Sequence, residues 1–275
     1  MKKKIALIAA ILVIIVSGLF LLKKALYTRR KLSFTIDTTY YWTKQQIQTG
    51  CWTYEDSPSG FQYNLYIPEK YQNDRDNESA KLPLIVTFHG SDERGASYSK
   101  YGRMFVRESF QKAIYPEGPA VLALRSRINY FTDTHSTSLL IQNVCLKNKC
   151  IDQTNIIGYG FSQGAKFVVQ LACDEPGLFR GVVSGSGFHQ MTFSELIKTL
   201  PIQFYWATSE DDSGIFEQGS PTGRKVGKYC KNSRYVQYKT RRHFFVELQD
   251  KTGRIKKDGT EETFVDWMCS VVNEK

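Results

Sequence analysis

The chain has 275 residues, of which 41% are hydrophobic and 23% charged, and its formal net charge is +10 at pH 7. This composition is that of an ordinary globular protein, so it excludes a disordered chain and a polytopic membrane protein. The length fits one α/β domain with a sizeable core and requires no second domain.

The positive charge is concentrated at the N-terminal end. Eight of the 37 basic residues lie within residues 2–31, and no acidic residue precedes Asp37. The remaining chain carries 29 basic and 27 acidic residues, a net charge of +2. Because a nucleic-acid groove needs positive charge clustered on the folded domain, the sequence predicts no nucleic-acid partner.

An unbroken apolar run, residues 5–22 (IALIAAILVIIVSGLFLL), lies between basic flanks. A helix of about 20 such residues crosses the hydrocarbon layer of a membrane. The run predicts one N-terminal transmembrane helix, with residues 1–31 as a membrane anchor. A cleaved signal peptide is the alternative, although its apolar region is usually shorter and no A-x-A cleavage site follows. Basic residues on both sides leave the orientation open.

Six cysteines form an even set, and Cys145 and Cys150 bracket a short polar segment, CLKNKC, that a disulfide could close. No Cys/His spacing indicates a zinc site, so no metal is predicted. Because disulfides persist outside the cytoplasm, we expect an extracytoplasmic domain, or a secreted one if the N-terminus is cleaved. Six buried free thiols are the alternative.

Residues 32–59 are interpreted as a juxtamembrane linker and domain entry, which leaves residues 60–275 as one folded domain. Residues 61–67 alternate apolar and polar side chains, the pattern of a strand with one buried face. Short apolar runs then recur, separated by stretches with helical spacing, at residues 84–88, 120–124, 155–158, 181–183, 202–207 and 235–238. They predict an α/β fold with a mostly parallel central sheet and helices on both faces. Ligand sites in such sheets lie beyond the carboxyl ends of the strands.

Ser162 stands at such a strand end, in the sequence Gly160-Phe-Ser-Gln-Gly164 before a helix-like stretch, KFVVQLAC. The Gly-x-Ser-x-Gly pattern needs small residues because its serine occupies a strained strand-to-helix turn. The context predicts Ser162 as a nucleophile, with a purely structural turn as the alternative. A serine hydroxyl also needs a base that takes its proton.

His243 is predicted as that base among the four histidines. It follows the last strand-like run, where the chain order serine, acid, histidine places it. His135, in a polar loop, and His189, after the sequence SGSGF, are the alternatives and suit surface or substrate contacts.

The acid is expected directly after the run 202–207, where three carboxylates are adjacent. An orienting carboxylate must reach the imidazole Nδ1. Asp211 is the first choice, Asp212 the second and Glu210 the third. At least one of them instead caps a following helix or is solvated.

Backbone N–H groups are predicted to stabilise the negative charge that develops on a substrate oxygen. The predicted donors are the N–H of Gln163, at the start of the helix, and the N–H of Ser91. His89 and Gly90 precede Ser91 directly after a strand, so they are expected to support an oxyanion loop rather than supply the base.

Several stretches together resemble one family: YNLYIP from Tyr63, LPLIVTFHGSDERG ending at Gly95, Ile151-Asp152 leading into GYGFSQGA, and LACDEPGLF from Leu171. In order and spacing they are similar to the polyhydroxybutyrate depolymerase and feruloyl-esterase-like group of α/β-hydrolases, over roughly residues 60–270. The resemblance implies the α/β-hydrolase fold, hydrolysis of a small-molecule or polymer-borne carboxylic ester through an acyl-enzyme, and no cofactor.

The chain departs from this family pattern at three places. Asp92 replaces the second glycine of the His-Gly-x-Gly-Glu-Arg-Gly motif, Thr208 replaces a glycine before the acid, and Arg241-Arg242 precede His243 in place of a small residue.

A peptidase or acyltransferase on the same residues is an alternative function, since the fold does not fix the leaving group. A catalytically silent, membrane-anchored binding module is another, against which the presence of a serine, an acid and a histidine argues.

Overall fold

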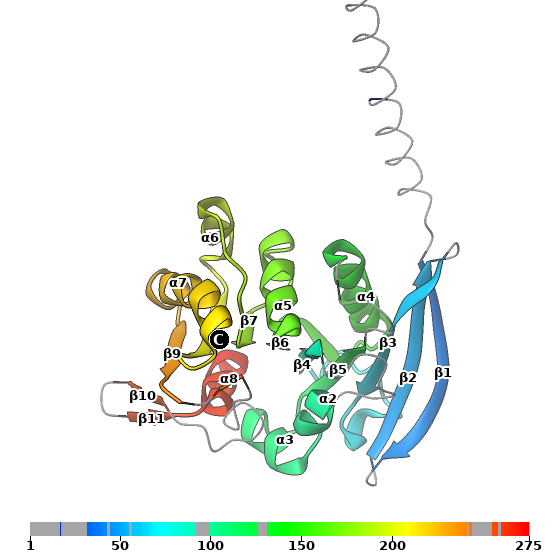
Figure 1. Ribbon diagram of the computed structural model, residues 1–275. Coiled ribbons are helices and arrows are strands. Elements are labelled where there is room, and N and C mark those ends of the chain that lie inside the picture. Colours follow the sequence, from blue (N-terminus) through cyan, green and yellow to red (C-terminus); the bar gives the residue numbers. More distant parts are fainter. Residues whose placement is uncertain are drawn as a thin grey trace, which may run out of the picture.

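The computed structural model describes residues 17, 32–42, 45–54, 57–91, 100–125, 131, 133–240, 242–243, 255–257 and 260–274 (Figure 1). The strands are β1 Leu32–Trp42, β2 Gln45–Tyr54, β3 Ser57–Tyr66, β4 Leu82–Phe88, β5 Ala120–Arg125, β6 Ile151–Phe161, β7 Gly181–Gly185, β8 Gln203–Ser209, β9 Arg234–Tyr238, β10 Ile255–Lys257 and β11 Thr260–Glu262. The helices are η1 Glu69–Tyr71, α2 Lys100–Phe105, α3 Glu108–Ile114, α4 Thr134–Lys147, α5 Gln163–Asp174, α6 Phe193–Thr199, α7 Ser213–Tyr229 and α8 Phe264–Asn273.

One twisted sheet organises the described part of the chain, in the order β1-β2-β3-β5-β4-β6-β7-β8-β9. The strands from β5 to β9 in this order pair in parallel, whereas β1, β2 and β3 are antiparallel and join the sheet through β5. Strands β4, β5 and β8 are buried along their whole length, as their continuous apolar sequences predict. The predicted α/β fold with a mostly parallel sheet is confirmed, and each predicted strand is present.

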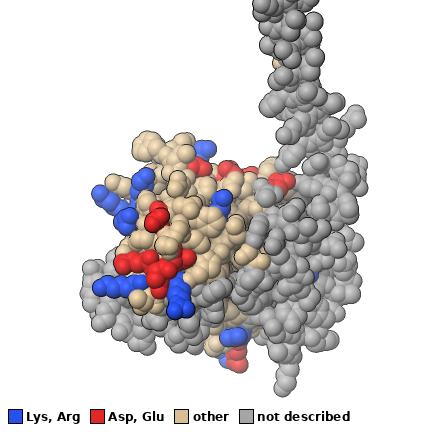
Figure 2. All heavy atoms as spheres, in the orientation of Figure 1, with Lys and Arg blue, Asp and Glu red and all other residues tan. Residues whose placement is uncertain are grey.

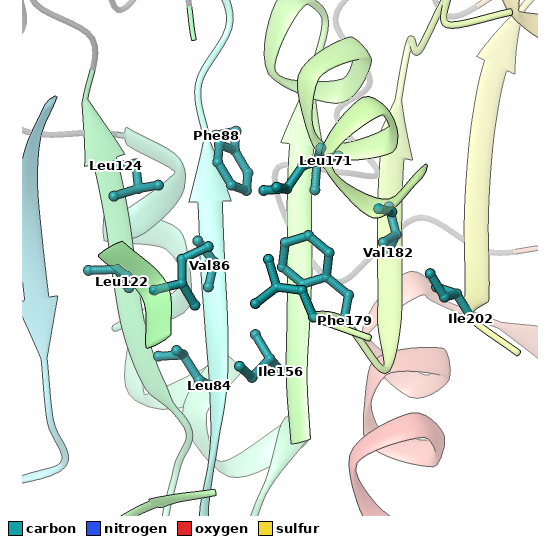
Figure 3. Close-up of a cluster of buried hydrophobic side chains, with 14 of the residues drawn as sticks. Leu84, Val86, Phe88, Leu122, Leu124, Ile156, Leu171, Phe179, Val182 and Ile202 are labelled. Carbon is teal, nitrogen blue, oxygen red and sulfur yellow. The ribbon is translucent and has the colours of Figure 1, made fainter. Parts of the chain in front are cut away.

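Helices cover both faces of the sheet (Figure 1). One apolar core lies beneath α4, α5, α6 and α7, and Figure 3 shows Leu84, Val86 and Phe88 of β4 at its centre, beside Leu171 of α5. The second core lies on the other face, where aromatic side chains of α2 and α3 pack with those of α8. Both faces of the sheet are therefore buried, so residues that contact a ligand are expected at the ends of the strands.

Residues 32–59 differ from their interpretation as a linker. Within this range, residues 32–42 form β1, residues 45–54 form β2 and residues 57–59 begin β3, and all three strands belong to the sheet. The antiparallel pairing of β2 with β1 and β3 satisfies the backbone hydrogen bonds of residues 45–54, which a linker would leave to solvent.

The predicted membrane anchor, residues 5–22, lies outside the described residues apart from Ser17 and stays a prediction. Among the helices that the structure describes, none is both long enough and apolar enough to cross a membrane. On the face that Figure 2 shows, the described basic and acidic side chains are interspersed rather than sorted into one basic stripe.

The predicted disulfide between Cys145 and Cys150 is not formed. Both are free thiols, as are the other described cysteines, Cys173, Cys230 and Cys269. Cys145 and Cys150 are almost completely buried in the first apolar core, where each packs as a small hydrophobic side chain. Burial raises the pKa of the Cys145 thiol to about 12.

Candidate active site

Ser162 occupies a sharp turn between β6 and α5. Its φ of 54° and ψ of −116° are rare for a residue with a side chain, so the turn stores backbone strain. The Ser162 N–H donates to the carbonyl of Gly185 at the end of β7, 2.8 Å away, which holds the turn. The predicted strand, turn and helix around Ser162 are therefore confirmed.

Gly160 and Gly164 permit this turn because neither position has room for a Cβ. A Cβ on Gly160 would lie 2.3 Å from the Gly164 carbonyl oxygen, and one on Gly164 would lie 2.1 Å from the carbonyl oxygen of Phe88. The first turn of α5 therefore packs directly against the end of β4. This close approach is the physical reason for the two glycines of the motif.

His243 reaches Ser162 from the segment after β9. Its Nε2 lies 2.9 Å from the Ser162 Oγ, across 81 residues of sequence. The ring also packs on Phe161, with 5.3 Å between ring centroids, and the side chain keeps 28% of its surface exposed. The structure thus brings together the two residues predicted as nucleophile and base.

The carboxylate beside the His243 ring belongs to Asp212, the second choice. Its Oδ2 lies 2.8 Å from His243 Nδ1, so Ser162, His243 and Asp212 form a chain of two hydrogen bonds. Asp212 is the N-cap of α7, but its side chain makes no capping hydrogen bond and is instead directed at the histidine. The side chain is 15% exposed, which places the carboxylate partly out of water.

Asp211, the first choice, has a different place, and this corrects the prediction. Its Oδ1 accepts hydrogen bonds from Ser209 Oγ at 2.6 Å and from the Arg242 backbone N–H at 2.7 Å. Arg242 has a φ of 55° and precedes His243, so Asp211 holds the segment that carries the histidine. Glu210, the third choice, accepts a hydrogen bond from Gln237.

Ser186 is a residue of this site that the sequence reasoning missed. It is completely buried, and its Oγ lies 3.2 Å from Asp212 Oδ2 and 3.3 Å from the His243 carbonyl oxygen. Its φ of 52° places it at a second strained turn, directly after β7. The sequence SGSG at a predicted strand end was the available signal, because polar residues there face the site.

One predicted oxyanion donor begins α5 and the other follows β4, the two elements that the glycines bring together. Gln163 is the first residue of α5, so its N–H points out of the helix without an acceptor inside it. Ser91 follows β4, against whose last residues α5 packs. His89 is buried, with Nδ1 2.6 Å from the Gly90 carbonyl oxygen, as expected for a residue that supports the loop. Asp92 lies outside the described residues.

The two alternative bases lie in other surroundings. His135, on α4, is an exposed residue whose Nδ1 lies 3.2 Å from Glu175 Oε1. His189 lies in the segment between β7 and α6, with its Nε2 3.5 Å from Glu195 Oε1. Each histidine is therefore paired with a glutamate, whereas His243 is paired with Ser162.

The arrangement has the parts needed for acyl transfer: a hydroxyl on a strained turn, an imidazole in contact with it, and a carboxylate that fixes the imidazole. The carboxylate accepts at Nδ1, so the proton is held there and the Nε2 lone pair faces the hydroxyl. All three side chains follow parallel strands, namely β6, β8 and β9, at the carboxyl end of the sheet.

No family model matches the sequence, and no curated protein is similar to it. Solved structures share its fold. A thermostable esterase has a TM-score of 0.56 at 16% identity, covering 76% of this chain and 68% of its own. An S-formylglutathione hydrolase from Agrobacterium tumefaciens has a TM-score of 0.55 at 12% identity, covering 78% of this chain and 94% of its own. A ferulic acid esterase has a TM-score of 0.54 at 9% identity, covering 79% of this chain and 93% of its own. An α/β hydrolase from a deep-sea metagenome library has 0.50 at 13%, covering 89% and 100%. At these identities the likeness establishes the α/β-hydrolase fold.

Proposed function

We propose that this α/β-hydrolase chain is a serine carboxylic-ester hydrolase in which Ser162 is the nucleophile, His243 the general base and Asp212 the orienting acid. The observation that carries the proposal is the chain of two hydrogen bonds, of 2.9 and 2.8 Å, that ends on a strained serine. Ser162 and Asp212, which lie 81 and 31 positions before His243 in the sequence, converge there on its imidazole ring.

In the first half of the reaction, His243 Nε2 takes the proton of Ser162 while Oγ attacks the ester carbonyl carbon. The resulting imidazolium is stabilised by Asp212, whose carboxylate also accepts a hydrogen bond from the Ser186 hydroxyl. The alcohol leaves with the proton returned by His243, and the acyl group stays on Ser162. In the second half, His243 deprotonates a water molecule, which attacks the acyl-enzyme and releases the carboxylic acid.

The tetrahedral intermediate of each half carries negative charge on the former carbonyl oxygen. The N–H groups of Gln163 and Ser91 are the proposed donors to that oxygen, and removing one such donor typically costs about 10²- to 10³-fold in kcat. Gln163 is favoured by its place beside Ser162, where the α5 N-terminus also contributes a positive dipole end.

The proposed substrate class is a carboxylic ester, borne on a small molecule or a polymer. Support comes from the structural neighbours, whose descriptions include a ferulic acid esterase and an acetyl xylan esterase from Paenibacillus, the latter with a TM-score of 0.54 at 13% identity. Rates on matched acetyl and feruloyl esters, together with the corresponding amides, separate an esterase from a peptidase.

A fluorophosphonate probe, which reacts with activated serines, tests the proposal on the purified full-length chain. We expect labelling of the wild type and none of Ser162→Ala. Ser194→Ala, which removes an exposed serine of α6, is the matched control and should label like the wild type. A folded wild-type protein that resists the probe would contradict the proposal and favour a binding module.

A further inference from the structure

Three side chains able to bind a metal ion converge away from Ser162. Cys173 Sγ, a ring nitrogen of His189 and a carboxylate oxygen of Glu195 lie within 4.8 Å of one another. Cys173 belongs to the last turn of α5, His189 to the segment between β7 and α6, and Glu195 to the first turn of α6. Helices α5 and α6 contact each other, so the cluster joins three elements of the fold (Figure 1).

The spacing of His189 and Glu195 matches a pair of metal ligands. Their Nε2 and Oε1 atoms are in ion-pair contact at 3.5 Å, and this buried Nε2 makes no hydrogen bond of ordinary geometry to any described residue. A distance of 3.5 Å is long for a hydrogen bond between nitrogen and oxygen. Two such ligands at 2.0–2.2 Å from a tetrahedral zinc ion lie about 3.3–3.6 Å apart.

Glu195 is held in place by groups that leave its second oxygen free for an ion. The backbone N–H and the hydroxyl of Thr192 donate to Oε2 at 2.6 and 2.8 Å, which completes the capping box of α6. Hydrogen bonds of this kind orient carboxylate ligands in metal sites. Oε1 consequently faces His189.

The third ligand is the thiol of Cys173, which binds zinc as a thiolate once the ion has displaced its proton, and a sulfur ligand suits the set to zinc. Cys173 is 1% exposed, whereas the side chains of His189 and Glu195 retain 14% and 25% of their surface. A thiolate and a carboxylate together balance the charge of a divalent ion, so the bound site would bury no net charge. A sulfur ligand at 2.3 Å from zinc lies about 3.6 Å from a nitrogen ligand, so a movement of about 1 Å closes the site.

We propose that Cys173, His189 and Glu195 bind one divalent ion of the zinc class, with a water molecule as the fourth ligand. Binding forms a bond from the metal to the thiolate, and the thiol proton is released to solvent. The site is distinct from the proposed esterase site. It fastens the segment from Ser186 to His189 onto α5, and this segment begins with the hydroxyl that contacts Asp212.

Cobalt(II) titration of the chelator-treated full-length protein tests this site without any measurement of activity. We expect one equivalent to produce a thiolate-to-cobalt charge-transfer band and visible bands of tetrahedral cobalt, and zinc to displace both. Cys173→Ala should abolish the charge-transfer band. His189→Gln should weaken binding by at least about 10- to 100-fold, since even the loss of a residue that only hydrogen-bonds to a metal ligand lowers metal affinity by that factor.

His135→Gln is the matched control, because His135 also faces a glutamate but belongs to no such cluster. Its cobalt spectrum and affinity should equal those of the wild type. Zinc should also raise the melting temperature of the wild type but not that of Cys173→Ala, whose folding is checked by circular dichroism. No cobalt spectrum in the wild type, or a charge-transfer band that persists in Cys173→Ala, would overturn the proposal. Fluorophosphonate labelling of Ser162 is independent of both results.

Discussion

Replacement of Asp212 by asparagine should nearly abolish turnover while leaving the fold intact. The Asp212 Oδ2 is 2.8 Å from His243 Nδ1 and can only accept, so it keeps the proton on Nδ1 and the lone pair on Nε2. An amide NH₂ in that place donates to Nδ1 and moves the ring proton to Nε2. A protonated Nε2, 2.9 Å from Ser162 Oγ, has no lone pair to take the hydroxyl proton.

The expected loss in kcat is about 10⁴-fold, the size typical of this change in a serine, histidine and aspartate triad. It corresponds to about 5.4 kcal/mol of transition-state stabilisation. The assay is hydrolysis of p-nitrophenyl acetate by the full-length chain at saturating substrate, with circular dichroism as the check on folding.

Asp211→Asn is the matched control at the neighbouring carboxylate. An asparagine oxygen still accepts from Ser209 Oγ and the Arg242 N–H, so we expect less than about a tenfold loss. Equal losses in the two variants, or more than about a tenth of wild-type activity in Asp212→Asn, would refute the assignment of Asp212.

Three further predictions concern the support of the site and the core. Ser186→Ala should lower kcat by roughly tenfold with little change in KM, because one hydrogen bond to Asp212 is lost; an unchanged kcat would make that contact incidental. Gly164→Ala should destabilise the fold by about 3 kcal/mol in urea unfolding, since its Cβ meets the Phe88 carbonyl; a midpoint equal to that of the wild type would show that the turn can relax. Because burial raises the pKa of Cys145 to about 12, only about one thiol in 10⁴ is ionised at pH 8, so iodoacetamide should modify the partly exposed Cys269 well before Cys145, with peptide mapping as the readout.

The sheet and the serine turn could be predicted because their causes are local. Continuous apolar runs mark strands buried on both faces. The glycines around Ser162 avoid steric clashes with residues close in sequence and with one neighbouring strand. Residues 32–59 were missed as strands because their Tyr, Thr and Gln side chains lack such a run.

The acid and the cysteine pairing could not be predicted because each depends on the direction of one side chain. Asp211 and Asp212 are adjacent, and only the start of α7 decides which of them faces His243. Cys145 and Cys150 have a spacing that suits a loop, but Cys145 belongs to α4 and faces the core. The role of Ser186 could not be predicted because its contact with Asp212 joins residues 26 positions apart in the sequence.

Capture of the acyl-enzyme tests the central claim most directly. The full-length chain is mixed with p-nitrophenyl acetate, quenched in acid within the first turnovers, digested and mapped by mass spectrometry. The proposed mechanism predicts one acetyl group on the peptide that contains Ser162, no such adduct in Ser162→Ala, and loss of the adduct as the substrate is exhausted. Hydrolysis that proceeds with no acyl group on Ser162, or at an unchanged rate in Ser162→Ala, would contradict it.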